Sequence, residues 1–542
     1  MTAPVSSPAT DAAVRLLTGL VERGVTDIVL SPGSRSQALA LAATALARSG
    51  SVRVHVRIDE RVAGFTALGL GRESGAPAAL ICTSGTATAG YLPAVMEAFH
   101  AGVPLILLTA DRPPELRGVG ANQATIQPGM FRPWARLSVD APVPGDAEPA
   151  VFAALAADAV AAAVGAAGEG LEGVAGPAHL NLPTREPLSG AVPDPLCASR
   201  GALPPSAPAQ PLRIAAGPRT VVVAGADAGP DAARIAREAG WPLIAEVVSG
   251  ARSGDPHVVP AYRDRLRDAA LAGRIQRVVV FGHPTLSREV AALLRRTDLD
   301  IVAVRRGGER LNPSGTAVDA RAVEVEPGPE DPEWLAAWTA PLVRGAAPAV
   351  DSGPVERAVV DRGALVRAVW AAGRPVDRLL FGSSRIVRVA DQLLEGRDVR
   401  VHANRGLAGI DGTIATGIGI ALAAEAGEAP GAGGTTRVLL GDLSLLHDVG
   451  SLLLPADEPA PRIQVIVGND GGGTIFDGLE VAGTAPSADL DRAFYTPQSV
   501  ALEPLAAAYG WTFVRAGTVA ELERALAAEV TGPQLIEVPL AR

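Results

Sequence analysis

Short apolar runs alternate with helical patterns along the first third of this 542-residue chain, which limits the folds open to it. A strand buried on both faces is a continuous apolar run, whereas a helix places apolar residues three or four positions apart. Repeated strand–helix–strand units predict a parallel sheet covered by helices on both faces. Here we expect helices at 10–23, 36–48, 60–71 and 87–101, and strands at 27–30, 52–57, 78–82 and 104–108.

The same alternation recurs in two later segments. A chain of this length has room for about three or four domains. We therefore predict an α/β protein with three doubly wound parallel-sheet domains in tandem. The strands that support this prediction are 220–224 and 277–281 in the middle, and 378–381, 398–402, 436–441, 462–468 and 534–538 near the end.

Two breaks in composition set the predicted domain boundaries. Residues 187–218 contain eight prolines, and residues 342–355 are rich in Gly, Ala and Pro. Such stretches are typical of extended connections rather than of helices or central strands. We expect domains at 1–186, 219–341 and 356–542.

Composition also narrows the cellular setting. We find no apolar run long enough for a membrane span and no signal-peptide pattern in the first 30 residues. The only cysteines are Cys82 and Cys197, which fits a reducing compartment. A net charge of -10 argues against a nucleic-acid-binding surface. We expect a cytoplasmic protein that binds neither membranes nor nucleic acid.

The chain contains no lysine, because all 48 of its basic residues are arginines. Schiff-base enzymes, including those that use pyridoxal phosphate, need a lysine amine, and so do P-loop NTPases. Both classes of enzyme are therefore excluded.

Two polar side chains end successive predicted strands in the last segment. Asp442 follows the run 436–441, and Asn469 follows the run 462–468. Carboxyl ends of neighbouring parallel strands meet at one edge of a sheet, and Mg²⁺ prefers carboxylate, amide and carbonyl oxygens. Nearby glycines let a diphosphate approach the main chain. A metal-diphosphate site and a pair of ordinary strand-to-helix turns both fit this pattern.

The first segment places a carboxylate and a turn of small residues after successive strands. Glu60, in Asp59-Glu60-Arg61, opens a predicted helix. It is either an acid that favours the helix dipole or a carboxylate that hydrogen-bonds a heterocycle nitrogen. The turn 83–87 has side chains small enough for a flat ring to lie against its backbone, although such turns are common.

Arginines follow several predicted strands, at 31–36, 109–114, 383–388 and 403–406. The planar guanidinium binds carboxylates through two hydrogen bonds. Several arginines converging on one edge would select a polyanionic substrate, whereas each alone fits a surface ion pair equally well. The Gly-rich run 405–412 either sets Ile410 against a cofactor or is simply a turn.

Together these motifs resemble the thiamine-diphosphate-dependent enzymes across nearly the whole chain. More narrowly, the chain is similar to the 2-succinyl-5-enolpyruvyl-6-hydroxy-3-cyclohexene-1-carboxylate synthase family of menaquinone biosynthesis at 31–36, 109–114, 122–123, 403–412, 441–448 and 469–476. One departure is Leu443, which stands where the wider superfamily often has Gly.

The resemblance implies that thiamine diphosphate binds with Mg²⁺, or alternatively Mn²⁺, held by Asp442, Asn469 and the carbonyl of Gly471. Glu60 is then the catalytic acid that contacts the aminopyrimidine and promotes its imino tautomer. Ile410 supports the bent cofactor. The implied cofactor-binding residues are Glu60, Ser84, Gly85, Thr86, Gln123, Ile410, Gly441, Asp442, Leu443, Ser444, Asn469, Gly471, Gly472, Thr474 and Ile475.

The implied reaction is a transferase reaction that decarboxylates 2-oxoglutarate and adds the succinyl carbanion equivalent to isochorismate. Several arginines would then bind substrate carboxylates, and Arg288 of the middle segment has the loosest motif match. The implied substrate-binding residues are Ser34, Arg35, Arg112, Asn122, Gln123, Arg288, Ser384, Arg388, Arg405, Ile475 and Phe476.

The family also implies an assembly in which each site forms between the first segment of one subunit and the third of another. We therefore expect a homodimer or a dimer of dimers (a homotetramer). Two other functions remain open on the sequence. One is an acetolactate-synthase-like lyase with FAD in its middle domain, and the other is a non-catalytic nucleotide-binding protein.

Overall fold

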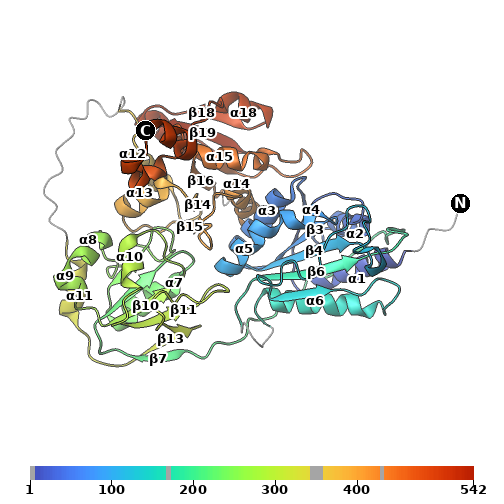
Figure 1. Cartoon of the computed structure of the whole chain (residues 1–542), viewed down its shortest axis with the longest axis horizontal. Coiled ribbons are helices and arrows are strands. Elements are labelled where there is room, and N and C mark those ends of the chain that lie inside the picture. Colours follow the sequence, from blue (N-terminus) through green and yellow to red (C-terminus); the bar gives the residue numbers. More distant parts are fainter. Residues whose placement is uncertain (1–6, 167–172, 342–357, 428–432) are drawn as a thin grey trace.

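The computed structural model describes residues 7–166, 173–341, 358–427 and 433–542. Its strands form three main parallel sheets, one in each third of the chain, as Figure 1 shows. The expected linker 342–355 lies outside the described residues. Within them, no helix combines the length and apolar character needed to cross a membrane.

The first sheet has the strand order β2-β1-β3-β4-β6-β5. Its strands are β1 (Asp27–Leu30), β2 (Arg53–Val56), β3 (Ala78–Cys82), β4 (Leu105–Asp111), β5 (Leu137–Asp140) and β6 (Pro177–Pro183). The helices are α1 (Pro8–Val21), α2 (Gln37–Arg48), α3 (Glu60–Ser74), α4 (Thr86–Gly90), α5 (Leu92–Ala101) and α6 (Ala150–Ala163), with a 3-10 turn η1 (Pro114–Leu116).

One expected helix of this domain is broken in two. The prediction of a single helix at 87–101 is wrong, because α4 ends at Gly90 and α5 begins at Leu92. Pro93 lies at the start of α5 and has no backbone N–H to donate to the preceding turn. The chain therefore bends there, directly after the turn 83–87.

The central sheet has the order β12-β11-β10-β8-β9, and a two-stranded sheet pairs β13 with β7. These strands are β7 (Leu212–Ala215), β8 (Thr220–Ala224), β9 (Leu243–Ala245), β10 (Arg277–Phe281), β11 (Asp300–Val304), β12 (Val318–Ala320) and β13 (Val323–Glu326). The helices are α7 (Pro230–Ala239), α8 (Tyr262–Arg267), α9 (Ala269–Ala272), α10 (Arg288–Leu293) and α11 (Pro332–Thr339). Strand β7 lies inside the range 187–218 expected as a linker, so the end of that range is part of a sheet.

The third sheet, β15-β14-β16-β17-β19-β18, repeats the connectivity of the first. Its strands are β14 (Arg378–Phe381), β15 (Arg400–Ala403), β16 (Thr436–Gly441), β17 (Ile463–Asn469), β18 (Thr512–Arg515) and β19 (Gln534–Pro539). The longer helices are α12 (Arg362–Ala372), α13 (Arg385–Leu393), α14 (Thr413–Gly427), α18 (Leu502–Ala508) and α19 (Val519–Ala527). Shorter helical turns are α15 (Asp442–His447), η3 (Val449–Leu452), η4 (Thr474–Gly478), α16 (Val481–Thr484), α17 (Ser487–Leu490) and η5 (Asp491–Tyr495).

Each main sheet has a hydrophobic core on both faces. In β8, Val222 packs into one core and Val223 into the other, and β3 and β16 alternate in the same way. Side chains of a strand point alternately to opposite faces, so both faces must be covered by helices. The predicted fold class of three doubly wound α/β domains is confirmed.

The first and third domains meet where α3 packs against α14, which lie side by side in Figure 1. Glycines make this approach close. A Cβ atom built on Gly69 would lie 2.1 Å from the backbone oxygen of Thr416, and one built on Gly419 would lie 2.1 Å from that of Thr66. Backbone atoms cannot move aside as a side chain can, so only glycine fits at these two positions.

We predict that Gly69→Ala lowers the melting temperature, because the added methyl group forces α3 and α14 apart at a cost of about 1–3 kcal/mol. Gly427→Ala is the matched control, since a Cβ there meets no atom of the described residues within 4 Å. Thermal unfolding of the three proteins checks this. A Gly69→Ala protein that melts like the wild type would show that the helices do not meet as described.

Candidate active site

The carboxyl edge of the third sheet brings Asp442 and Asn469 together. Strand β16 ends at Gly441, which pairs in register with Gly468 of β17. Asp442 therefore follows one strand where Asn469 ends the next, at the same level of the sheet. The structure therefore places these two residues at the same edge of the sheet, as the sequence predicts for parallel strands.

Asp442 is buried, and within the described residues no cationic side chain pairs with it. Burial, together with the nearby Asp470, raises the pKa of Asp442 although the amides of Leu443 and Gly472 oppose the shift. Asp470 has its own counter-ion, since Arg362 lies 2.7 Å from it. The uncompensated charge of Asp442 fits a position beside a bound cation.

Asn469 and the turn after it supply the other oxygens. The side-chain amide of Asn469 donates to Glu537 at 2.8 Å, which fixes the direction of its oxygen. Gly471 has φ of +73°, and its carbonyl accepts from Arg542 at 3.1 Å. A Cβ atom on Gly472 would lie 2.2 Å from the backbone oxygen of Tyr495.

The oxygen atoms of these three residues are the kind of ligand that a hard cation prefers. The described residues contain no group of three or more His, Cys, Asp or Glu side chains placed to hold a metal. A set made of one carboxylate, one amide oxygen and one carbonyl is instead typical of Mg²⁺, which takes its remaining ligands from water and phosphate. Around Gly441 a Cβ atom would meet nothing within 4 Å, so the main chain is open to a ligand there.

Glu60 is free to act chemically because its neighbour caps the helix. The side chain of Asp59 accepts from the amides of Arg61 at 2.8 Å and Val62 at 3.4 Å. Asp59 is therefore the cap, while Glu60 is the acid in the first turn of α3, where it also favours the helix dipole. The Glu60 side chain packs against Gly90, because a Cβ atom built on Gly90 would lie 2.9 Å from the Cβ atom of Glu60.

No hydrogen bond or ion pair joins Glu60 to Asp442 within the described part of the chain. The helices that carry them do touch, because the guanidinium of Arg61 donates to the backbone oxygen of His447 at 2.9 Å. One chain thus connects α3 to α15 without bringing the two acids into contact.

The turn that precedes α4 is held by two glutamines. The hydroxyl of Ser84 donates to the backbone oxygen of Gln123 at 2.9 Å, and the Gln123 amide donates back to Ser84 at 2.8 Å. The amide of Gly85, with φ of +84°, donates to the side chain of Gln127 at 2.8 Å. Gln127 is fully buried, and sequence reasoning missed it because no local pattern marks it.

Several arginines of the first domain have buried N–H groups without hydrogen-bond acceptors among the described residues, namely Arg35, Arg57, Arg72, Arg112 and Arg136. Of these, Arg35 and Arg112 belong to the expected site. Arg35 donates to the backbone oxygen of Thr184 at 2.8 Å, but its Nε has no acceptor within the structure described. The Nε of Arg112 likewise has no hydrogen-bond acceptor among the described residues. Unmet buried donors of this kind fit an anionic ligand. Ser34 and Asn122 are exposed near these loops.

Arg388 and Arg405 form a cationic pair in the third domain. Ser384 caps α13, and its backbone oxygen accepts from Arg388 at 3.0 Å. Burial lowers the pKa of Arg405 and the charge of Arg388 lowers it further, while the carboxylates of Glu246 and Glu97 oppose the shift. Burial also lowers the pKa of Arg388, assisted by Arg263. Like charges held together in a buried place favour a bound anion.

Arg288 is placed differently from these arginines. Its side chain is 75% exposed at the start of α10, and Glu480 lies 4.0 Å away. Ile475 and Phe476 lie on η4, where the ring of Phe476 stacks edge-on against Phe494. Thr474, on the same turn, donates its hydroxyl to Asp470.

The loop that carries Ile410 is packed onto the first domain. A Cβ atom on Gly412 would lie 1.9 Å from the ring of Phe65 in α3, so glycine is required. The next helix, α14, is capped by Asp448, whose carboxylate accepts from the amides of Ile414 at 2.7 Å and Ala415 at 3.2 Å. Asp448 therefore fixes where this loop ends.

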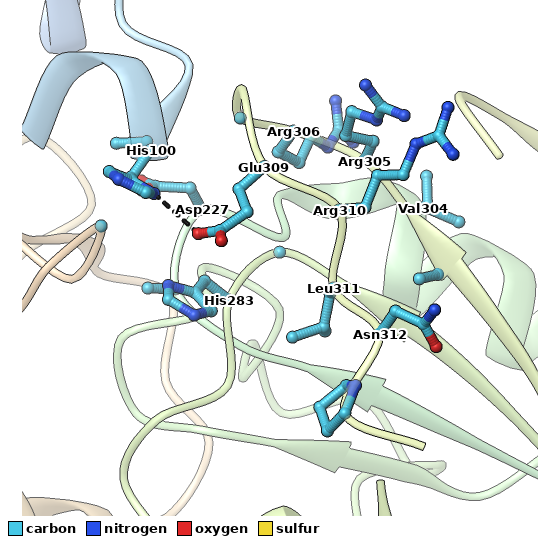
Figure 2. Close-up of a pocket in the computed structure, with 17 residues that line it drawn as sticks. His100, Asp227, His283, Val304, Arg305, Arg306, Glu309, Arg310, Leu311 and Asn312 are labelled. Carbon is cyan, nitrogen blue, oxygen red and sulfur yellow. Dashed lines mark ion pairs between the residues drawn. The ribbon is translucent and has the colours of Figure 1, made fainter. Parts of the chain in front are cut away.

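A separate cavity of about 300 Å³ lies at the carboxyl edge of the central sheet (Figure 2). Glu309 crosses it to pair with His100 of α5 at 3.1 Å, which connects the central domain to the first. Gly406 and His283 also line the cavity, so it borders the loop after Arg405.

The chain is similar to known proteins over nearly its full length. Residues 10–130 match the family described as "Thiamine pyrophosphate enzyme, N-terminal TPP binding domain". The chain is 52% identical to a 2-succinyl-5-enolpyruvyl-6-hydroxy-3-cyclohexene-1-carboxylate synthase of Leifsonia xyli subsp. xyli, with 99% of this chain and 97% of the relative covered. Identity to the synthase of that name from Clavibacter michiganensis subsp. michiganensis is 50%, over the same shares of the two chains.

A solved structure shares the fold at low sequence identity. The benzoylformate decarboxylase from Polynucleobacter necessarius superimposes with a TM-score of 0.70 over 99% of both chains, at 15% identity. This likeness supports the three-domain architecture alone.

Asp448 gives this site a testable pH dependence. Burial raises the pKa of Asp448 from 3.8 to about 6. Because this pKa is higher in the folded protein, protonation favours folding, and the benefit is full below about pH 4 and lost above pH 6. We predict that the stability of the wild type relative to Asp448→Asn falls by about 3 kcal/mol between pH 4 and 7. Urea denaturation across that range measures it, and parallel curves for the two proteins would contradict it.

Proposed function

The chain belongs to the 2-succinyl-5-enolpyruvyl-6-hydroxy-3-cyclohexene-1-carboxylate synthase family, and we propose that it decarboxylates 2-oxoglutarate and transfers the succinyl unit to isochorismate in menaquinone biosynthesis. The cofactor is thiamine diphosphate. The observation that carries the proposal is the buried, uncompensated Asp442 beside Asn469 at one sheet edge. That pair matches the motif expected for the diphosphate end of this cofactor.

We propose Mg²⁺ as the cation, with Mn²⁺ as an alternative. Asp442, the Asn469 side-chain oxygen and the Gly471 carbonyl would hold it, and the loop residues Gly441, Leu443, Ser444 and Gly472 would line the diphosphate. Glu537 orients the Asn469 amide, and the Asn469 oxygen accepts from the backbone amide of Gly471 at 3.3 Å. Thiamine diphosphate, when bound, supplies the carbon centre that accepts the electrons released as carbon dioxide leaves.

Glu60 holds and moves the proton at the aminopyrimidine nitrogen in this proposal. Asp59 takes over the capping of α3, so the Glu60 carboxyl is free for that proton. Ser84, Gly85, Thr86 and Gln123 form the surface for the ring, and the Gln127 side chain keeps the Gly85 backbone in its left-handed conformation. Ile410 and Ile475 would complete the cofactor pocket.

Both substrates carry carboxylates, and the unpaired donors of Arg35 and Arg112 together with the Arg388 and Arg405 cluster provide the matching positive charge. Hydrogen bonds to charged groups are worth about 1.5–3 kcal/mol each. Such bonds explain why a site for two anionic substrates needs several arginines. The remaining proposed contacts are Ser34, Asn122, Gln123, Arg288, Ser384, Ile475 and Phe476.

We propose a homodimer or a dimer of dimers, in the cytoplasm, with each site shared between subunits. Large apolar side chains close to the site support it, because Ile58 is 69% exposed and Leu407 is 48% exposed. Ile58 lies two residues before Glu60, and Leu407 lies between Arg405 and Ile410. A second copy that supplied the opposite half of the site would cover both.

We predict that Glu60→Gln reduces turnover at least about 100-fold, because the amide cannot exchange the proton with the pyrimidine ring. Carbon dioxide release from 2-oxoglutarate, with and without isochorismate, measures it. Asp59→Asn is the matched control, since asparagine also caps a helix, and its activity should stay close to that of the wild type. Normal turnover in Glu60→Gln with an unchanged melting temperature would refute the assigned role.

A second prediction concerns the metal. Thiamine diphosphate with Mg²⁺ should raise the melting temperature of the wild type, because a ligand that binds only the folded state stabilises it. Asp442→Asn should show little or no rise at the same ligand concentrations, and EDTA should abolish the rise in the wild type. Parallel measurements with Mn²⁺ compare the two metals. An equal rise in Asp442→Asn would rule out the proposed metal ligand.

A further inference from the structure

Glu246 is a completely buried acid of the central domain that none of the functions described so far uses. It follows β9 directly, and its carboxylate reaches the loop between β10 and α10. There it accepts from the amide of Leu286 at 2.7 Å and from the amide of Thr285 at 2.9 Å. Within the described residues no ion pair neutralises it, so its binding partners are backbone amides.

The same loop holds Arg405. The guanidinium of Arg405 donates to the Thr285 hydroxyl at 2.7 and 2.9 Å, and to the Thr285 backbone oxygen at 3.3 Å. It also donates to the hydroxyl of Ser383 at 3.1 Å. One residue of the central domain thus supplies most of the contacts that orient a guanidinium of the third domain.

Contacts on the main chain restrict Arg405 in the same way. His283 is 2.9 Å from the backbone oxygen of Arg405 through its Nδ1 atom. The next two residues, Gly406 and Leu407, donate their amides to the Glu97 carboxylate of the first domain at 2.8 and 2.7 Å. The backbone of the Arg405 loop is therefore fixed, and the direction of the guanidinium depends on where Thr285 stands.

We propose that Glu246 is a positioning residue for the substrate-binding Arg405, acting through the amides of Thr285 and Leu286 to set the Thr285 hydroxyl against the guanidinium. This inference rests on the proposed function, in which Arg405 binds a substrate carboxylate. Glu246 touches no substrate in this arrangement. Its removal would let the 285–286 loop shift and leave Arg405 poorly aimed.

The charges around Glu246 make the same contact sensitive to pH. Burial, and repulsion from Asp391, raise the pKa of Glu246 to about 8, while Arg405 opposes the shift. The ionised form accepts amide hydrogen bonds more strongly than the protonated form. The charged or titratable groups that face this cluster are Asp391, Arg388, Arg405, Arg263, Tyr262 and His283.

The test compares Glu246→Ala with Glu246→Gln in steady-state decarboxylation and transfer. We expect Glu246→Ala to raise the KM for one of the two substrates at least tenfold, with a smaller change in kcat. Glu246→Gln should restore a near-normal KM, because its amide oxygen can still accept from both backbone amides. Between pH 7 and 9 the wild-type KM should fall as pH rises, whereas that of Glu246→Gln should stay constant.

Thr285→Val tests the contact between Thr285 and Arg405 without changing the buried acid, and Thr285→Ser is its conservative control. This pair also tests the inference if Glu246→Ala does not fold. Thr285→Val should raise the same KM, and Thr285→Ser should not. The double variant Glu246→Ala/Thr285→Val should show less than the sum of the two effects, because both act on Arg405 through one contact.

The outcomes separate the two proposals. A wild type that releases no carbon dioxide from 2-oxoglutarate would overturn the proposed function and this inference with it. An active wild type would overturn only the inference if Glu246→Ala and Thr285→Val lowered the melting temperature and left KM unchanged. Fully additive effects of the two substitutions on KM would overturn it as well.

Discussion

The carboxyl ends of β16 and β17 constrain the candidate site, because they hold the buried Asp442 beside Asn469 with no cationic partner in the described part of the chain. Burying the Asp442 carboxylate away from water costs free energy. The negative charge of Asp470 raises that cost, even though Asp470 itself forms an ion pair with Arg362. The Asp442 carboxylate is hydrogen-bonded by the backbone amides of Leu443 and Gly472, but it forms no ion pair within the described residues. In the proposed function a cation would compensate this charge, so we expect cofactor binding to stabilise this edge of the sheet.

A second constraint is that all three domains fix the loop after β15. The first domain holds Gly406 and Leu407 through Glu97, and the central domain holds Arg405 through His283 and Thr285. Through these contacts the central domain helps to position the Arg405 loop, whether or not it also contacts substrate. The close packing of α3 on α14 keeps the first and third domains at the distance that these contacts need.

The sequence predicted the features that follow from local patterns along the chain. Parallel strands were visible as apolar runs, and residues at their carboxyl ends, such as Asp442 and Asn469, had to share an edge. It could not predict contacts made across the fold: Gln127 meets Gly85 from 42 residues away, and Glu246 meets Thr285 from 39 residues away. The sequence also could not show which acid caps α3, a role that Asp59 takes in the structure. Strand β7 was missed since its proline-rich surroundings outweighed four residues of strand pattern.

The exclusive use of arginine has a physical consequence at this site. Burial lowers the pKa values of both Arg388 and Arg405. A neighbouring guanidinium lowers each further, that of Arg263 for Arg388 and that of Arg388 for Arg405. Arginine tolerates this because its ordinary pKa lies above about 12, so it remains charged at neutral pH. A lysine starts about two units lower and loses its proton readily when it is buried beside other cations. A dense cationic pocket for carboxylate substrates is therefore better built from guanidinium groups, whose charge survives the crowding that makes the pocket selective.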